Sequence, residues 1–201
     1  MNEQLRQLRE ITTQFNTRQD GDSPHISGYF AVFDSVYEIG PGMTESIAPG
    51  AFTKTLAEDD IRVLVNHDTT LVAGRNKAGT AEFIEDARGL WADVAVNPKD
   101  SDIMNAWHRV ERGDVNQASF GFEIIKQDTE VKPDGSVHWT LLEVRLYEVS
   151  ICTFPAYKET NIAARAKERD DLKARELAAW KERMKEALKH GTESPAAEKA
   201  D

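Results

Sequence analysis

Between residues 26 and 154, the chain alternates short β-prone runs with clusters of turn-forming residues. Apolar runs and apolar–polar alternation predict strands over residues 26–33, 45–47, 61–65, 80–84, 90–96, 118–125, 137–142 and 144–154. Turn formers at residues 48–50, 86–89 and 133–135 separate several of these runs. This succession predicts a mostly antiparallel sheet of about seven strands, curled or closed into a β-barrel.

Helical periodicity flanks and interrupts the predicted sheet. Apolar positions at helical spacing predict an amphipathic helix within residues 2–17, and turn formers over residues 18–24 predict a linker after it. A second helix is expected to begin at a capping residue, Asp100 or Ser101, and to end at Gly113. The fold class is therefore α+β, with helices around the sheet.

The last segment has a different composition. Residues 160–190 are rich in Ala, Glu, Lys, Arg and Leu, which are strong helix formers, but their apolar stripe is thin. A helix of this kind docks on a partner or projects into solvent; a solvated or disordered tail is the alternative. The expected parts are an N-terminal helix and linker (residues 1–24), a globular domain (25–162), and a charged helical arm with a flexible tail (163–201).

The net charge of the chain and its distribution limit which partners the chain can bind. The 201 residues include 25 Lys and Arg against 35 Asp and Glu, a net charge of −10. Residues 158–201 carry 11 basic and 10 acidic side chains, so the acidic surplus lies in the preceding part. An acidic body disfavours nucleic acid as the main ligand, because phosphate contacts need clustered Lys and Arg. No apolar run reaches the ~20 residues that span a bilayer, so no membrane association is expected.

The sequence predicts neither a metal nor another cofactor. None of the five histidines stands at a metal-ligand spacing, and no glycine-rich phosphate-binding motif is present. The single cysteine, Cys152, excludes a disulfide within the chain and fits a reducing compartment. Cys152 lies in an apolar run and is expected to be a small buried residue.

Three polar residues lie in or next to predicted strands, at positions where their side chains could take part in catalysis. His67 follows the apolar run at 61–65, although a structural histidine at a strand end would show the same pattern. Ser119 shares a strand face with Gly121, which suits either a nucleophile approached by a peptide or close packing of another backbone. Glu148 interrupts an apolar run, either as an outward-facing residue or as a carboxylate that orients a histidine.

Five motifs in order resemble the serine proteases that mature the proheads of tailed phages, a family distantly similar to the herpesvirus protease assemblin. The matching segments are GYFAVF at 28–33, ESIAPGAF at 45–52, LVNHD at 64–68 with AGR at 73–75, SFGF at 119–122, and YEVSICTFPAY at 147–157. Each motif is short, but the resemblance as a whole spans about residues 26–162. The resemblance implies an assemblin-like β-barrel.

The resemblance also implies a Ser–His–acid mechanism. His67 matches the family's catalytic histidine and Ser119 its nucleophile. Glu148 is placed as the third member, because it heads the run that resembles the assemblin strand carrying the third catalytic residue. His138 and Glu143 are nearby alternatives. A histidine in this role takes the serine proton and returns it to the leaving amine.

Two further positions bear on this assignment. Asp68 is adjacent to His67, although consecutive residues of a strand point in opposite directions. Assemblin uses the backbone of a basic residue shortly after the matching run in its oxyanion hole. Ala156 occupies that offset here, so only its backbone N–H is expected to contribute.

The implied function is an endopeptidase that cleaves scaffold segments of the capsid protein, and itself, inside a procapsid in the cytoplasm of the bacterial host. The expected partners are the major capsid protein with its scaffold segment and further copies of this chain. The alternative is an inactive capsid-assembly or scaffold protein on the same fold, which the intact His67, Ser119 and Glu148 set disfavours. A small-molecule hydrolase is a third possibility and would need a deep pocket rather than a groove.

Overall fold

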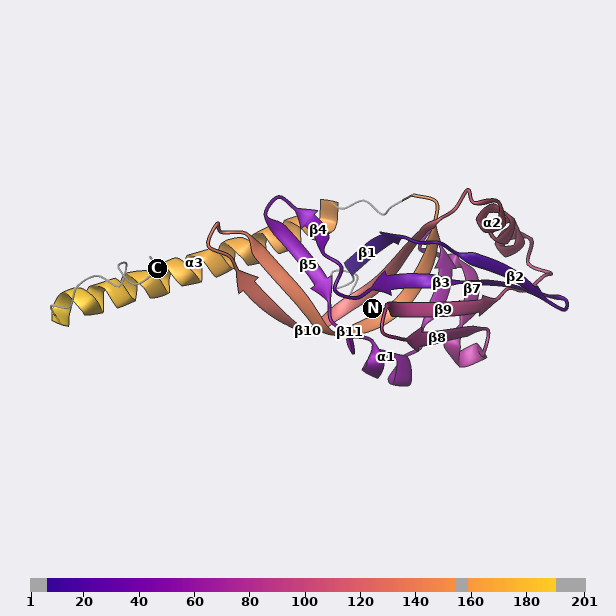
Figure 1. Ribbon diagram of the computed structural model, residues 1–201, viewed down its shortest axis with the longest axis horizontal. Helices are drawn as coiled ribbons and strands as arrows, with labels where there is room; N and C mark the ends of the chain where they lie inside the picture. The colour runs from indigo at the N-terminus through magenta and orange to yellow at the C-terminus, as the bar shows by residue number, and fades with distance from the viewer. Residues whose placement is uncertain (1–6, 155–158, 191–201) are drawn as a thin grey trace.

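The computed structural model describes residues 7–154 and 159–190, which form two β-sheets and three α-helices (Figure 1). The strands are β1 (Gln7–Thr12), β2 (Asn16–Asp20), β3 (Ser23–Val32), β4 (Tyr37–Gly40), β5 (Met43–Ile47), β6 (Arg62–Val65), β7 (Asp68–Arg75), β8 (Ala81–Glu85), β9 (Gly89–Ala95), β10 (Gln117–Val131) and β11 (Val137–Cys152). The helices are α1 (Thr53–Glu58), α2 (Ser101–Arg112) and α3 (Glu159–His190), with a 3₁₀ turn, η2 (Asn76–Ala78), after β7.

The larger sheet has seven strands and the smaller has four. In the larger sheet, β1, β10, β11, β5 and β4 are neighbours in that order, and β6 and β7 extend the sheet from β11. The smaller sheet has the order β2, β3, β9, β8. All the strand pairs are antiparallel except those of β11 with β5 and β6.

A long hairpin of β10 and β11 runs through the larger sheet (Figure 1). The first part of β11 pairs in parallel with β5, from Val137 opposite Met43 to Leu141 opposite Ile47. Its last part pairs in parallel with β6, from Glu148 to Ile151. The two separate strands expected over 137–142 and 144–154 are therefore one strand of 16 residues. Because β11 is long, one of its edges pairs with two short strands, β5 and β6.

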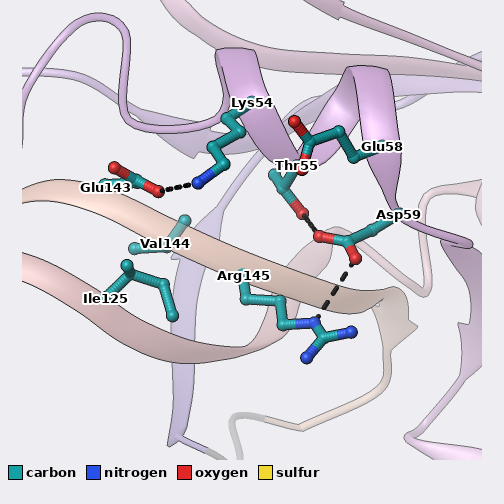
Figure 2. Close-up of a pocket in the computed structure, with 8 residues that line it drawn as sticks. All are labelled: Lys54, Thr55, Glu58, Asp59, Ile125, Glu143, Val144 and Arg145. Atoms are coloured by element: carbon teal, nitrogen blue, oxygen red, sulfur yellow. Dashed lines mark hydrogen bonds and ion pairs between the residues drawn. The ribbon is translucent and has the colours of Figure 1, made fainter.

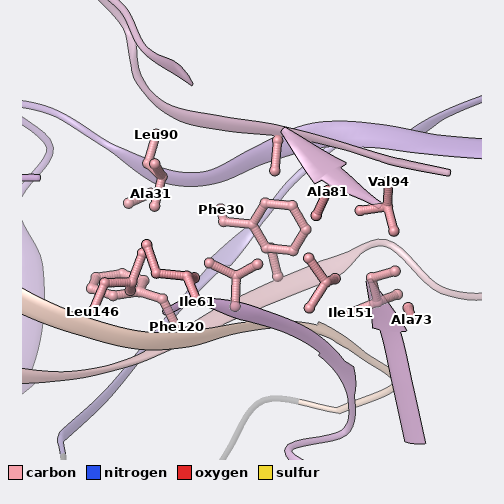
Figure 3. Close-up of a cluster of buried hydrophobic side chains, with 14 of the residues drawn as sticks. Phe30, Ala31, Ile61, Ala73, Ala81, Leu90, Val94, Phe120, Leu146 and Ile151 are labelled. Atoms are coloured by element: carbon pink, nitrogen blue, oxygen red, sulfur yellow. The ribbon is translucent and has the colours of Figure 1, made fainter. Parts of the chain in front are cut away.

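The main hydrophobic core lies between the two sheets and includes α2. Figure 3 shows Phe30 and Leu90 of the smaller sheet, together with Phe120, Leu146 and Ile151 of the larger one. All five are at most 1% exposed, and fully burying a side chain of this size contributes about 1.5–3 kcal/mol. Because strand side chains alternate between faces, the residues between these core positions on β10 and β11 face away from this core.

Several elements are confirmed. The runs at 26–33, 61–65, 80–84, 90–96 and 118–125 correspond to β3, β6, β8, β9 and the first part of β10. Asp100 caps α2 by accepting hydrogen bonds from the backbone N–H groups of Asp102 and Ile103, and Gly113 ends the helix with a φ of 86°. The charged segment is the helix α3.

The expected N-terminal helix is wrong for the described residues. Residues 7–12 form β1, which pairs with β10, and residues 16–20 form β2, which pairs with β3. Ile11 on β1 and Phe15 in the connection between β1 and β2 pack against the main core. Pairing with strands distant in sequence outweighs a local helical periodicity that covers only about four turns.

The closed barrel is not confirmed. Among the described residues, the strands form two sheets of seven and four, and no ladder joins them into one closed barrel. The count also exceeds the expected seven, because β1, β2, β4 and β7 come from segments without a clear strand pattern. The α+β class is confirmed.

The start of α3 is attached to the body, and the rest projects away from it (Figure 1). Ala166 and Leu172 pack against a second apolar cluster made of Ile39, Met43, Val137 and Trp139. Further along, Leu177 and Trp180 are each 51% exposed. In the described parts of the chain, no helix is long and apolar enough to cross a membrane.

Candidate active site

The turn between β6 and β7 presents His67. The last residue of β6, Val65, pairs with the first residue of β7, Asp68, so Asn66 and His67 form a two-residue hairpin loop. Asn66 has a φ of 51° and His67 a φ of 59°. Positive φ at both loop positions is the type I′ pattern, in which Asn is common first and Gly second. A histidine in the second position is strained by about 1–3 kcal/mol, and such strain is concentrated at functional sites.

The His67 ring is held against a buried carboxylate. Its Nδ1 atom lies 2.8 Å from Oε1 of Glu148 on β11, and the Glu148 side chain is 4% exposed. Burying a carboxylate is costly unless it is paired, so the outward-facing interpretation of Glu148 is wrong. The pairing fixes which ring nitrogen faces the acid and places Nε2 on the other side of the ring.

The other oxygen of the same carboxylate is also engaged. The Ser150 hydroxyl donates a hydrogen bond to Glu148 Oε2 at 2.6 Å. The same hydroxyl oxygen accepts one from the backbone N–H of His67 at 3.2 Å. Ser150 is fully buried. It therefore contacts both members of the His67–Glu148 pair.

Ser119 lies on the same face of the sheet. It stands directly opposite Ser150 in the β10–β11 register, and Gly121 stands opposite Glu148. Facing residues of an antiparallel pair have Cβ atoms about 4.5–5.5 Å apart. Ser119 is fully buried, and its Oγ has no hydrogen-bond partner among the described residues. The structure thus brings His67 and Glu148 into contact and places Ser119 one strand away, without a hydrogen bond to His67.

The Nε2 side of the His67 ring faces Cys152. The Cys152 Sγ atom lies 3.8 Å from Nε2 and is buried, as expected. Burial, followed by the charges of Glu148 and Glu10, raises the pKa of this thiol to about 12. Cys152 is therefore a neutral thiol near neutral pH and not a nucleophilic thiolate.

Asn66 ties the turn to the end of β11. Its side-chain Nδ2 donates to Thr153 Oγ1 at 3.4 Å, and its Oδ1 accepts from the Thr153 backbone N–H at 2.9 Å. Its backbone N–H donates to the Ile151 carbonyl. The sequence alone led to no predicted role for Ser150 or Asn66. The available signals were the period-2 spacing of 148, 150 and 152, and an Asn-His pair directly after a strand.

The other candidates for the third catalytic residue contact groups other than His67. His138 contacts the hydroxyls of Thr44 and Ser46, both at 2.9 Å. Glu143 pairs with Lys54, and the Asp68 carboxylate accepts from the backbone and hydroxyl of Thr70. Hydrogen bonds from Thr70 hold the pKa of Asp68 below its usual value. Ala156, expected in the oxyanion hole, lies outside the described residues.

A pocket of about 250 Å³ lies apart from these residues, between α1 and the β10–β11 hairpin (Figure 2). Four of its charged groups form ion pairs: Lys54 with Glu143 at 3.1 Å, and Arg145 with Asp59 at 3.3 Å. It is a surface pocket braced by ion pairs. No group of three or more His, Cys, Asp or Glu side chains suited to a metal occurs in the described residues.

Known proteins share this sequence pattern. The family described as caudovirus prohead serine protease matches residues 10–175. The prohead protease of Enterobacteria phage HK97 is 30% identical over 167 residues, which cover 82% of this chain and 70% of that protein. No solved structure matches.

Proposed function

This chain belongs to the caudovirus prohead serine protease family, and on that premise we propose that it is a capsid maturation protease. Its substrates are the scaffold segment of the major capsid protein and this chain itself. Both are cut inside the procapsid, in the cytoplasm of the bacterial host. Self-association and contact with the capsid protein bring enzyme and substrate together.

The observation that carries the proposal is the contact of His67 Nδ1 with Glu148 Oε1 at 2.8 Å, on the sheet face that also holds Ser119. In the proposed mechanism, Glu148 accepts a hydrogen bond from the Nδ1–H group of His67 and so holds the ring in the tautomer with an unprotonated Nε2. A carboxylate in this position also stabilises the imidazolium that forms during the reaction. This is the arrangement that a general base for a serine hydroxyl needs.

Ser119 is the proposed nucleophile. Its Oγ forms a bond to the scissile carbonyl carbon while Nε2 of His67 takes the hydroxyl proton. The proton then passes to the leaving amine as the C–N bond breaks, and water hydrolyses the acyl-enzyme by the same route. The hydrogen bond between Ser119 and His67 forms with bound substrate, since catalytic hydrogen bonds in free enzymes are often long. The backbone N–H of Ala156 is the proposed oxyanion donor.

Incubation of the purified chain with a capsid protein that carries its scaffold segment tests this function. Mass spectrometry of the new termini is expected to show time-dependent cleavage that stops in Ser119→Ala and after treatment with a serine-reactive phosphonate. Ser27→Ala is the matched control, because Ser27 is also a buried serine but lies on the smaller sheet. Undiminished cleavage by folded Ser119→Ala contradicts the serine mechanism, and no cleavage by the wild-type chain supports the inactive capsid-assembly alternative.

A further inference from the structure

The strongest feature outside the three assigned residues is the hydroxyl of Ser150. It donates to Glu148 Oε2 at 2.6 Å and accepts from the His67 backbone N–H at 3.2 Å. Ser150 has no exposed surface. A buried hydroxyl with both its donor and its acceptor engaged holds its two partners in a defined relative position.

The contact with Glu148 determines how the carboxylate is turned. One carboxylate oxygen faces His67 Nδ1 and the other faces Ser150 Oγ. A carboxylate held at both oxygens cannot rotate about its terminal bond without breaking a charge-assisted hydrogen bond, which is stronger than a hydrogen bond between neutral groups. Ser150 thus keeps one oxygen directed at the histidine.

The contact with His67 stabilises a strained backbone. His67 has a φ of 59°, a conformation that is unfavourable for a residue other than glycine and persists only where its surroundings hold it. The Ser150 oxygen accepts the N–H of that same residue. One hydroxyl therefore supports the backbone from which the base extends and the carboxylate that the base contacts.

We propose that Ser150 is a positioning residue for the reaction: it aligns Glu148 with the ring of His67 and does not touch the substrate. This inference rests on the proposed function. Ser150 is not a second nucleophile, because its proton is donated to Glu148 and its contact with His67 is to the backbone rather than to Nε2. Catalytic geometry needs supporting groups of this kind, since small misplacements cost large factors in rate.

The test compares Ser150→Ala and Ser150→Cys with wild type in a peptide-cleavage assay that separates kcat from KM. Cysteine nearly preserves the volume of serine but is a weak hydrogen-bond donor and acceptor, so it keeps the site filled if alanine fails to fold. Each folded variant is expected to lose about 10- to 100-fold in kcat with little change in KM, as for a group that acts on the transition state. Ser27→Ala is again the control. Full kcat in a folded Ser150 variant overturns the inference.

A double-mutant cycle separates positioning from general support of the fold. In a Glu148→Gln background, the Ser150 substitution is expected to cost less than in the wild-type background, because the part of its effect that passes through the Glu148 carboxylate is already lost and only its support of the His67 backbone remains. An undiminished 10- to 100-fold loss in that background shows an independent role and overturns the proposal. An active wild type with an inactive Ser119→Ala upholds the proposed function whatever the Ser150 variants do, so the two failures are distinguishable.

Discussion

The Nδ1 atom of His67 lies 2.8 Å from Oε1 of Glu148, although the two residues are 81 positions apart in the chain. Their contact depends on the parallel pairing of β6 with the end of β11, which sets Val65 opposite Ile151 and so places the β6–β7 turn at the end of β11, from where the His67 side chain reaches Glu148. A histidine directed by a carboxylate has its tautomer fixed.

Ser119→Ala and His67→Ala are each expected to lower kcat by about 10⁴–10⁶, and the double variant is expected to be little worse than either alone. Residues that act as one unit give strongly non-additive losses. Cleavage kinetics and melting curves on the same preparations check this. A merely structural His67 would instead leave the activity per folded molecule unchanged.

Glu148→Gln is expected to reduce kcat by about 10²–10⁴, because an amide can present the wrong group to His67 Nδ1 while the nucleophile and base remain. The loss is smaller than that of Ser119→Ala. The comparison uses Glu143→Gln as control, since Glu143 contacts Lys54 rather than His67. Equal activity of wild type and Glu148→Gln contradicts the assignment of the acid.

Cys152 is expected to resist alkylation by iodoacetamide at pH 8 in the native chain and to react after denaturation. Burial, followed by the charges of Glu148 and Glu10, raises its pKa to about 12, so the thiol stays protonated in the folded state at this pH. In the unfolded chain the pKa of this thiol is near its ordinary value of 9.0. Folding stability attributable to this group therefore falls as pH rises from about 9 toward 12. Rapid native labelling that abolishes cleavage contradicts this prediction.

Asn66→Ala is expected to destabilise the fold by about 1–2 kcal/mol and to reduce kcat, because Ala is strained at positive φ and lacks the amide contacts. Asn66→Gly removes the same contacts with Thr153 but accepts the observed φ of 51°. The glycine variant should be the more stable of the two in urea titrations. Identical stability of the two variants means that the turn conformation contributes nothing.

The start of α3 is expected to be part of the folded body. Arg165 donates to Oε2 of fully buried Glu45 at 2.6 Å, and Arg9 contacts both oxygens of the same carboxylate. Arg165→Ala removes one partner of a buried ion pair and is expected to cost about 3 kcal/mol in urea titrations. Lys181→Ala on the exposed part of α3 is the control and should change stability by less than about 0.5 kcal/mol.

Truncation after residue 173 tests the proposed arm, because it keeps Arg165 and Leu172 in place. The shortened chain is expected to fold and to cleave peptide substrates normally, but to enter procapsids poorly. Sedimentation of assembled procapsids followed by gel analysis measures the incorporated enzyme. A deletion that starts at residue 163 would also remove Arg165. Poor incorporation could then result from lower stability of the fold rather than from loss of the arm. Normal incorporation of the shorter chain contradicts a recruiting role.

Local signals in the sequence were enough for much of the fold. Helix α2 has a cap at Asp100, an apolar stripe and a terminal Gly113, all within 14 residues. Strands such as β3 and β9 are β-prone apolar runs bounded by turn formers. In these elements the local conformational preference and the tertiary environment agree, which is why pattern alone predicts them.

The N-terminal segment shows where pattern fails. Residues 7–12 form a strand because the free edge of β10 accepts them, and no local feature records that pairing. The buried cluster of Arg9, Glu45 and Arg165 joins segments that are 36 and 120 positions apart. Charged residues in sequence are expected at the surface, and only the approach of three elements makes their burial possible.

The residues of the candidate site could be selected from the sequence, but their arrangement could not. Period-2 alternation places Glu148, Ser150 and Cys152 on one face of a strand, whatever that strand pairs with. The neighbours of that face depend on register: Ser119 stands opposite Ser150, and the parallel pairing with β6 brings in His67. Register is set by the burial of the whole opposite face against the core, so it is a property of the tertiary structure and not of any single motif.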